Sequence, residues 1–235
     1  MKQLLVFLGI TFLGYTGAMA QMTFHSAYEI KKAVELLDFN RRHSGDISKF
    51  LTEANINGSP FLNDEFIEGS VFTTSKTQFV GVPLRYNIYN DQIEFQLGEN
   101  PVQALAAPET IEMVQYGEYT FEYAPFTNAK KIKRGFFIIE EKGNATLYSK
   151  PQLIFENAKE PAAYQDAVPA RFLKRPDEYY IRVGKEPAML MAKKKDLEEV
   201  FPDHKDEISG FIKKNKVKPN DQELLKELVQ FYNSL

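Results

Sequence analysis

Hydrophobic and polar residues alternate with a period of two in the middle of the chain. Residues 84–88 and 93–97 both show this alternation, and Asn90 and Asp91 lie between them. A period of two places successive side chains on opposite faces of a β-strand. Asn and Asp tolerate the left-handed backbone of a tight turn. The two segments are therefore predicted to form a β-hairpin.

Further strand-like segments fill the region from residue 58 to residue 191. Tyr119, Phe121 and Tyr123 share one face of a predicted strand, and residues 136–139 form the continuous apolar run typical of a central strand. The remaining strands are expected at residues 145–155, 171–173, 178–183 and 188–191. Short connections favour antiparallel pairing. We therefore predict a mainly β (α+β) fold, with an antiparallel β-sandwich or barrel-like sheet of about 9–11 strands.

The pattern changes to helical spacing in the C-terminal segment, residues 192–235. Helices are expected at residues 196–201 and 204–215, and a third from Asn220, which forms a capping box with Glu223. Its apolar stripe consists of Leu224, Leu225, Leu228, Val229 and Tyr232. A helix with such a stripe covers another surface. We expect these helices to pack on the β region, and the alternative is a docking surface for a partner.

The first 57 residues divide into two segments. Lys2 precedes an apolar run at residues 4–13 that is too short for a transmembrane helix, and Ala18-Met19-Ala20 has the small residues that signal peptidase accepts. We therefore predict a signal peptide at residues 1–20, followed by an N-terminal segment with a short helix at residues 21–57. The alternative for the first segment is a buried helix or a membrane anchor. The predicted location is periplasmic, secreted or at the cell surface, with no transmembrane segment after cleavage.

Composition and charge narrow the class of protein. The 235 residues contain no cysteine, which excludes disulfides, zinc–thiolate sites, cysteine nucleophiles and the thiol of a lipoprotein. The formal net charge of −3 lacks the basic excess of a nucleic-acid-binding protein. Two basic clusters are interpreted as a solvated turn and a helix end, or as contacts for an anionic surface. They are Lys130, Lys131, Lys133 and Arg134, and Lys213, Lys214, Lys216 and Lys218.

Several motifs resemble a group of uncharacterised exported proteins of Bacteroidetes-type bacteria. They are Gly58-Ser59-Pro60-Phe61-Leu62-Asn63-Asp64-Glu65-Phe66 with Gly69, Val82-Pro83-Leu84-Arg85-Tyr86-Asn87-Ile88-Tyr89, Asp177-Glu178-Tyr179-Tyr180-Ile181, Phe211-Ile212-Lys213-Lys214-Asn215-Lys216 and Phe231-Tyr232-Asn233. The resemblance implies a β-rich envelope or secreted protein. The resemblance implies no particular activity and no catalytic residues.

Residues with catalytic potential are few and scattered. His25, His43 and His204 have no partner at the spacing of a zinc-binding helix. Serine-nucleophile, P-loop and dinucleotide-binding motifs do not occur in the sequence. We therefore assign no catalytic, cofactor-binding or metal-ligating residue, and we expect no cofactor.

Adjacent acidic residues leave a glycosidase-type pair open. The candidates are Asp64/Glu65, Glu140/Glu141 and Glu198/Glu199. Two carboxylates a few ångströms apart suffice for glycoside hydrolysis. Neighbours on a strand point to opposite faces, so Glu140 and Glu141 are not expected to share a site if both stay in the strand. Glu198 and Glu199 are expected in the first turn of a short helix, where acids suit the helix dipole.

Three functions remain open. The first is an exported, non-catalytic cell-envelope or secreted protein that binds an unknown envelope protein or is a structural component. The second is a carrier of a small apolar ligand in a lipocalin-like barrel, whose cavity the many Tyr and Phe residues would line. The third is a hydrolase with paired carboxylates. We expect the first and regard enzymatic activity as the less favoured alternative.

Overall fold

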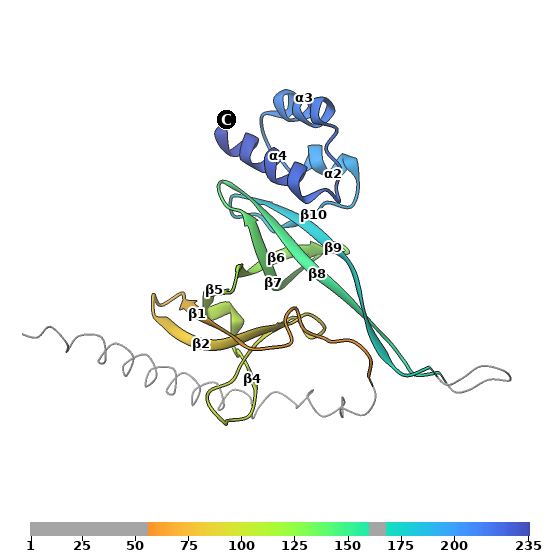
Figure 1. The fold of residues 1–235 in the computed structure, drawn as a ribbon. Coiled ribbons are helices and arrows are strands. Elements are labelled where there is room, and N and C mark those ends of the chain that lie inside the picture. The colour runs from red at the N-terminus through yellow and green to blue at the C-terminus, as the bar shows by residue number, and fades with distance from the viewer. Residues whose placement is uncertain (1–55, 160–167) are drawn as a thin grey trace, which may run out of the picture.

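One ten-stranded antiparallel sheet forms most of this computed structural model, which describes residues 56–159 and 168–235 (Figure 1). The strand order is β10-β9-β8-β7-β6-β5-β1-β2-β3-β4. The strands are β1 (Ile67–Thr73), β2 (Gln78–Asn87), β3 (Gln92–Phe95), β4 (Gln103–Ala104), β5 (Ile111–Tyr116), β6 (Tyr119–Asn128), β7 (Lys131–Glu141), β8 (Ala145–Glu156), β9 (Arg171–Val183) and β10 (Met189–Leu190). The sheet curls into a half-barrel, which confirms the predicted fold class. The predicted signal peptide and the first helix lie outside the described residues.

The predicted hairpin at residues 84–97 is confirmed. Leu84 pairs with Phe95 and Asn87 pairs with Gln92 across β2 and β3. Asp91 has a φ of 52°, the left-handed conformation expected of this turn. The Asn87 side chain accepts a hydrogen bond from the backbone N–H of Asn90 at 3.0 Å and so fixes the turn.

The predicted strands at 171–173 and 178–183 are one continuous strand, β9. Pro176, which has no backbone N–H to donate to a neighbouring strand, lies between the two predicted segments. In the structure, the register shifts between Lys150 and Gln152 of β8 at this point. Pro151 of β8 therefore lies opposite Pro176 and Asp177 in a bulge, where a strand tolerates proline.

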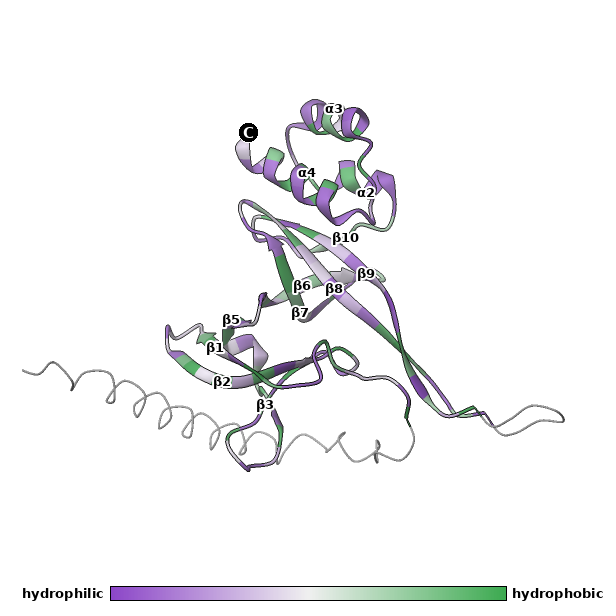
Figure 2. Ribbon diagram, in the orientation of Figure 1, coloured by the Kyte–Doolittle hydropathy of each residue, from purple (hydrophilic) through white to green (hydrophobic). Residues whose placement is uncertain are grey.

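Three apolar clusters stabilise the sheet. The N-terminal core lies between β1, β2, β3, β5 and one face of β6 and β7, where Tyr86 and Phe121 have ring centroids 5.1 Å apart. The central core lies on the other face of β6 and β7 and contains Phe126, Phe137 and Tyr180. Figure 2 shows the resulting strongly apolar stretch of β7. Both faces of these two strands are thus buried, which explains the continuous apolar run at residues 136–139.

The third apolar cluster, the helical core, joins the C-terminal helices to the sheet. The helices are α2 (Lys194–Glu199), α3 (Lys205–Asn215) and α4 (Gln222–Ser234). Leu225, Leu228 and Val229 of α4 are buried together with Leu147 and Ile181 of β8 and β9. None of the described helices is long and apolar enough to cross a bilayer.

The N-cap of α4 lies one residue later than predicted. Asp221, and not Asn220, is the N-cap, and its side chain accepts a hydrogen bond from the backbone N–H of Leu224 at 3.2 Å. Asp and Asn are almost equally good caps, so sequence alone does not separate two adjacent candidates. Glu223 still lies in the first turn, where the helix dipole favours an acid.

Gly69→Ala is expected to lower the free energy of unfolding by about 3 kcal/mol, the upper end of the usual overpacking cost. Gly69 lies beside the register shift between β1 and β2. A Cβ at this position would overlap the backbone oxygen of Gln115 and the Cβ of Tyr116. Urea unfolding followed by circular dichroism measures the cost. Gly210→Ala, where the added Cβ meets no atom within 4 Å, is the control and is expected not to destabilise.

Candidate functional site

The strands β7 and β8 separate in the middle of the sheet. β7 pairs with β6 along residues 131–138, but it pairs with β8 only at Ile138, Ile139 and Glu141. Beyond this point β8 and β9 continue together as a two-stranded arm, residues 150–156 and 171–178. The separation leaves the backbone N–H and carbonyl oxygen of Phe136 without a partner strand on this side.

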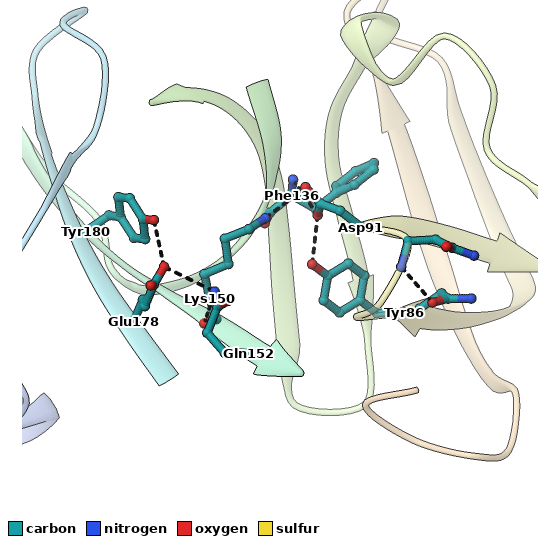
Figure 3. Close-up of polar contacts among 9 residues, drawn as sticks. Tyr86, Asp91, Phe136, Lys150, Gln152, Glu178 and Tyr180 are labelled. Atoms are coloured by element: carbon teal, nitrogen blue, oxygen red, sulfur yellow. Dashed lines mark hydrogen bonds and ion pairs between the residues drawn. The ribbon is translucent and has the colours of Figure 1, made fainter. Parts of the chain in front are cut away.

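A partly buried polar cluster lies between the strands (Figure 3). Oδ1 of Asp91 accepts hydrogen bonds from the Phe136 backbone N–H at 3.1 Å and from the Tyr86 hydroxyl at 2.7 Å. Nζ of Lys150 donates to Oδ2 of Asp91 at 2.9 Å and to the Phe136 carbonyl oxygen at 2.8 Å. We call these four residues the clasp. Two side chains thus replace the backbone partners that β8 supplies elsewhere, and they tie the β2–β3 turn to β7 and β8.

Local geometry and burial hold the clasp in place. A Cβ on Gly135 would overlap the Asp91 carboxylate, so the turn approaches β7 at a residue without a side chain. The Lys150 amine lies 4.7 Å from the centre of the Phe137 ring. Burial lowers the pKa of Lys150, while Asp91 and Glu178 oppose this shift. The Lys150 amine and the Asp91 carboxylate are both hydrogen-bonded to other groups of the protein, so this geometry supports a structural role for the clasp.

Neighbouring side chains continue the polar cluster along β8 and β9. Oε2 of Glu178 accepts hydrogen bonds from Gln152 Nε2 at 3.2 Å and from the Tyr180 hydroxyl at 2.8 Å. Next to Tyr148 of the central core, Glu122 forms an ion pair with Arg182 at 2.6 Å. Each of these carboxylates has a donor from another strand or from a neighbouring residue, as buried charges require.

Aromatic residues form a second contact between the β2–β3 turn and the arm. The Tyr89 ring lies 5.3 Å from Phe172 and 6.2 Å from Phe155, and these two rings are 5.1 Å apart. Asn57 forms a parallel bridge to Arg171 beside them. The turn between β2 and β3 is therefore fixed to the arm by both polar and apolar contacts.

Residues 61–66 and the end of β2 lie together beside this turn. The Arg85 guanidinium lies 3.5 Å from the centre of the Phe61 ring and 4.4 Å from that of Phe66. Leu62 donates its backbone N–H to the Tyr86 carbonyl oxygen at 3.0 Å. Packing alone thus explains why these residue types occur together.

An exposed cationic hairpin projects from the sheet where β6 meets β7. All eight residues from 127 to 134 are exposed, and they include Lys130, Lys131, Lys133 and Arg134 but no acid. Among the described residues, no carboxylate oxygen lies within 4.0 Å of these four cations. The first basic cluster is therefore at a solvated turn, as predicted, and its charges are not neutralised by ion pairs.

The second basic cluster lies at a helix end, also as predicted. Lys213 and Lys214 lie in the last turn of α3, and Lys216 follows it. Cations at this position are favoured by the helix dipole. The dipole of α3 thus provides a structural reason for these charges. The cations of the β6–β7 hairpin lie at no helix end, so this reason does not apply to them.

The candidate acid pair of β7 binds α4. A bulge between Ile139 and Glu141 lets Glu140 and Glu141 both reach that helix. Glu140 accepts a hydrogen bond from Gln222 at 2.6 Å, and Glu141 accepts one from Gln230 at 2.6 Å. The two glutamines are eight residues apart, or about 12 Å along a helix, so the carboxylates do not converge on one point.

The other candidates lie in a loop or at helix ends. Glu198 and Glu199 end α2, so their predicted place in the first turn is wrong, because the helix begins at Lys194. Asp64 accepts a hydrogen bond from Ser59, and Glu65 is exposed. His204 precedes α3 and faces the Tyr232 ring at 6.3 Å. His25 and His43 lie outside the described residues.

Within residues 56–159 and 168–235, no three His, Asp or Glu residues are grouped closely enough to hold a metal ion.

Sequence reasoning missed both the clasp and the extent of the hairpin. Asp91 was predicted only as a turn residue, and Lys150 lies 59 residues away from it in sequence. No local pattern signals such a contact. Residues 124–135 were not predicted as strands because the exposed hairpin has no apolar alternation, and its two-residue turn, Ala129-Lys130, lacks the usual Gly or Asn.

Comparison of the chain with protein-family models, with curated proteins and with solved structures finds no match.

Proposed function

We propose that this is an exported, non-catalytic protein of the cell envelope that binds an anionic partner through its cationic β6–β7 hairpin. The observation that carries the proposal is the run of eight exposed residues with four cations and no acid. The sequence features that predict export, above all residues 1–20, support the location. The curled sheet then serves as a rigid support for the hairpin.

The distribution of charge favours an anionic partner. The whole chain has a net charge of −3, but residues 127–134 carry four positive charges. A local positive field on an acidic protein steers anions toward one place. Lysine on an exposed strand also prevents edge-to-edge aggregation, but a single inward or edge charge is enough for that purpose. Four cations on one hairpin exceed that need.

The other two functions have weaker support. A carrier needs an open interior, whereas the inward rings of the N-terminal core pack on one another, with Tyr116 and Phe121 stacked at 5.3 Å. A hydrolase needs converging acids, whereas Glu140 and Glu141 each bind a different glutamine of α4. Binding through the surface uses the cationic hairpin, which neither a carrier nor a hydrolase requires.

Two variants with equal loss of charge test the proposal. The first replaces Lys130, Lys131, Lys133 and Arg134 with Gln, and the matched control replaces Lys213, Lys214, Lys216 and Lys218 with Gln. The wild-type protein is expected to be retained on immobilised heparin, a sulfated polymer. The hairpin variant should elute at clearly lower salt than the control. Binding to a polyanion depends on the number of cations at the contact, through the counterions that they release, and not on the net charge of the protein.

Circular dichroism and the urea midpoint first establish that both variants are folded. Equal elution of the two variants, or no retention of the wild-type protein, would contradict the proposal. Equal elution would mean that net charge, and not the hairpin, determines the binding.

A further inference from the structure

An isoleucine stands among the cations of the hairpin. Ile132 is 69% exposed, which is the highest value among the large hydrophobic residues of the described ranges. It lies between Lys131 and Lys133, and it pairs with Thr127, which is exposed as well. A single exposed aliphatic side chain is common on protein surfaces, and what distinguishes Ile132 is its position among four unpaired cations.

The cations surround this isoleucine on both faces of the hairpin. Side chains alternate along a strand, so Lys131 and Lys133 lie on one face, and Ile132 and Arg134 lie on the other. Lys130 lies in the turn itself. A peptide lying along one face would contact only part of this set. A planar anionic surface that meets the hairpin tip-first would contact all of it.

We infer that the β6–β7 hairpin docks tip-first on the surface of an anionic phospholipid bilayer. Lys130, Lys131, Lys133 and Arg134 contact lipid phosphates, and Ile132 enters the interfacial region between the headgroups. This inference rests on the proposed function and names its partner. An apolar residue framed by cations is the combination that binds peripheral proteins to anionic membranes.

The docking depth is limited by the backbone. Ile132, Arg134 and Phe136 are alternate residues of β7, and the N–H and carbonyl of Phe136 are hydrogen-bonded to Asp91 and Lys150 and not to β6. By the same alternation, the backbone N–H and carbonyl groups of Arg134 and Ile132 also point away from β6. Free backbone groups are costly in hydrocarbon but are hydrated among headgroups. The tip is thus suited to the interface and not to the bilayer centre.

The expected effects are large enough to measure. Each cation near an anionic bilayer contributes about fivefold to the partition coefficient, so the four together contribute several hundredfold. Ile132→Ser is expected to weaken binding by about tenfold, as the loss of a partly inserted aliphatic side chain predicts. Val80→Ser is the matched control, because Val80 is 51% exposed on β2 and lies outside the hairpin.

Co-sedimentation with lipid vesicles tests the inference. The full chain after residue 20 is mixed with vesicles of equimolar phosphatidylglycerol and phosphatidylcholine, and with vesicles of phosphatidylcholine alone. The wild-type protein and Val80→Ser should bind the anionic vesicles only. Ile132→Ser should bind them about tenfold more weakly, and the four-Gln hairpin variant should not bind at measurable levels.

Heparin retention of the same proteins separates the two proposals. If Ile132→Ser binds vesicles like the wild-type protein, or if the wild-type protein does not bind vesicles while heparin retention still depends on the hairpin, the membrane inference is wrong. The partner is then a soluble anionic polymer or an acidic protein, and the proposed function stands. If neither surface binds the wild-type protein, both proposals are wrong.

Discussion

Asp91→Ala is expected to lower the free energy of unfolding by about 3 kcal/mol, which is near the usual cost of breaking a buried ion pair. The substitution leaves three donors without their acceptor: the Phe136 N–H, the Tyr86 hydroxyl and the Lys150 amine. The Lys150 side chain is 13% exposed and that of Asp91 is 31% exposed, so water compensates only part of the loss. Urea unfolding followed by circular dichroism measures the change.

A double-mutant cycle assigns this effect to the clasp. Lys150→Met keeps an aliphatic chain against Phe137 and leaves two donors on Asp91, so its expected cost is smaller, about 1 kcal/mol. In the double variant no buried ammonium is left unpaired, so its cost should be less than the sum of the single costs by at least about 1 kcal/mol. Asp206→Ala, at an exposed position in the first turn of α3, is the control and should cost about 0.5 kcal/mol. If Asp91→Ala costs no more than this control, the clasp does not stabilise the fold.

Alkaline conditions are expected to unfold the protein near pH 11. Tyr86, Tyr116, Tyr148 and Tyr180 are each at most 3% exposed. Burial raises the pKa of all four, and neighbouring acids raise it further for Tyr86, Tyr148 and Tyr180. Above the unfolded pKa of about 10, the unfolded chain releases these protons and the folded protein keeps them. Stability therefore falls as the pH rises.

The size of the effect follows from linkage. At pH 11, one unit above the unfolded pKa, each buried tyrosine removes about 1.4 kcal/mol, and four remove about 6 kcal/mol. This approaches the whole stability of many domains. Lys150 acts in the opposite direction, because its lowered pKa adds stability as the pH rises toward about 10.5, but it is a single group.

Tyrosinate absorbance measures this transition directly. The four buried tyrosines should ionise only together with the loss of the circular dichroism signal. Tyr148→Phe keeps the ring in the central core and removes one ionising group, so the loss of stability between pH 9 and pH 11 should become smaller by about 1.4 kcal/mol. A single smooth titration of all tyrosines in the folded protein would contradict this prediction.

Local patterns predicted the fold well wherever one side of an element is buried. The alternation of β2 and β3 and the apolar stripe of α4 are of this kind, because burial selects the residues that produce the pattern. The tip of the β6–β7 hairpin was missed because nothing covers either of its faces. The joining of β9 across Pro176 was missed because it depends on a bulge opposite another proline.

The candidate site was much less predictable than the fold. The basic composition of the hairpin was visible in the sequence, but its isolation from carboxylates depends on the packing of the whole sheet. The clasp depends on Asp91, Phe136 and Lys150, which come from different hairpins of the sheet. Contacts between such distant residues leave no local periodicity.

The hydrogen bonds between Asn233 and Ala145 have a consequence for the order of folding. Asn233 accepts from the Ala145 backbone N–H at 2.7 Å and donates to its carbonyl oxygen at 2.9 Å. These residues are 88 positions apart, so the start of β8 has its full set of contacts only after 88 further residues have been synthesised. Contacts of such high sequence separation form slowly, because loop closure comes before the contact. We therefore expect the β7–β8 turn to be among the last parts of the sheet to become protected from hydrogen exchange during refolding.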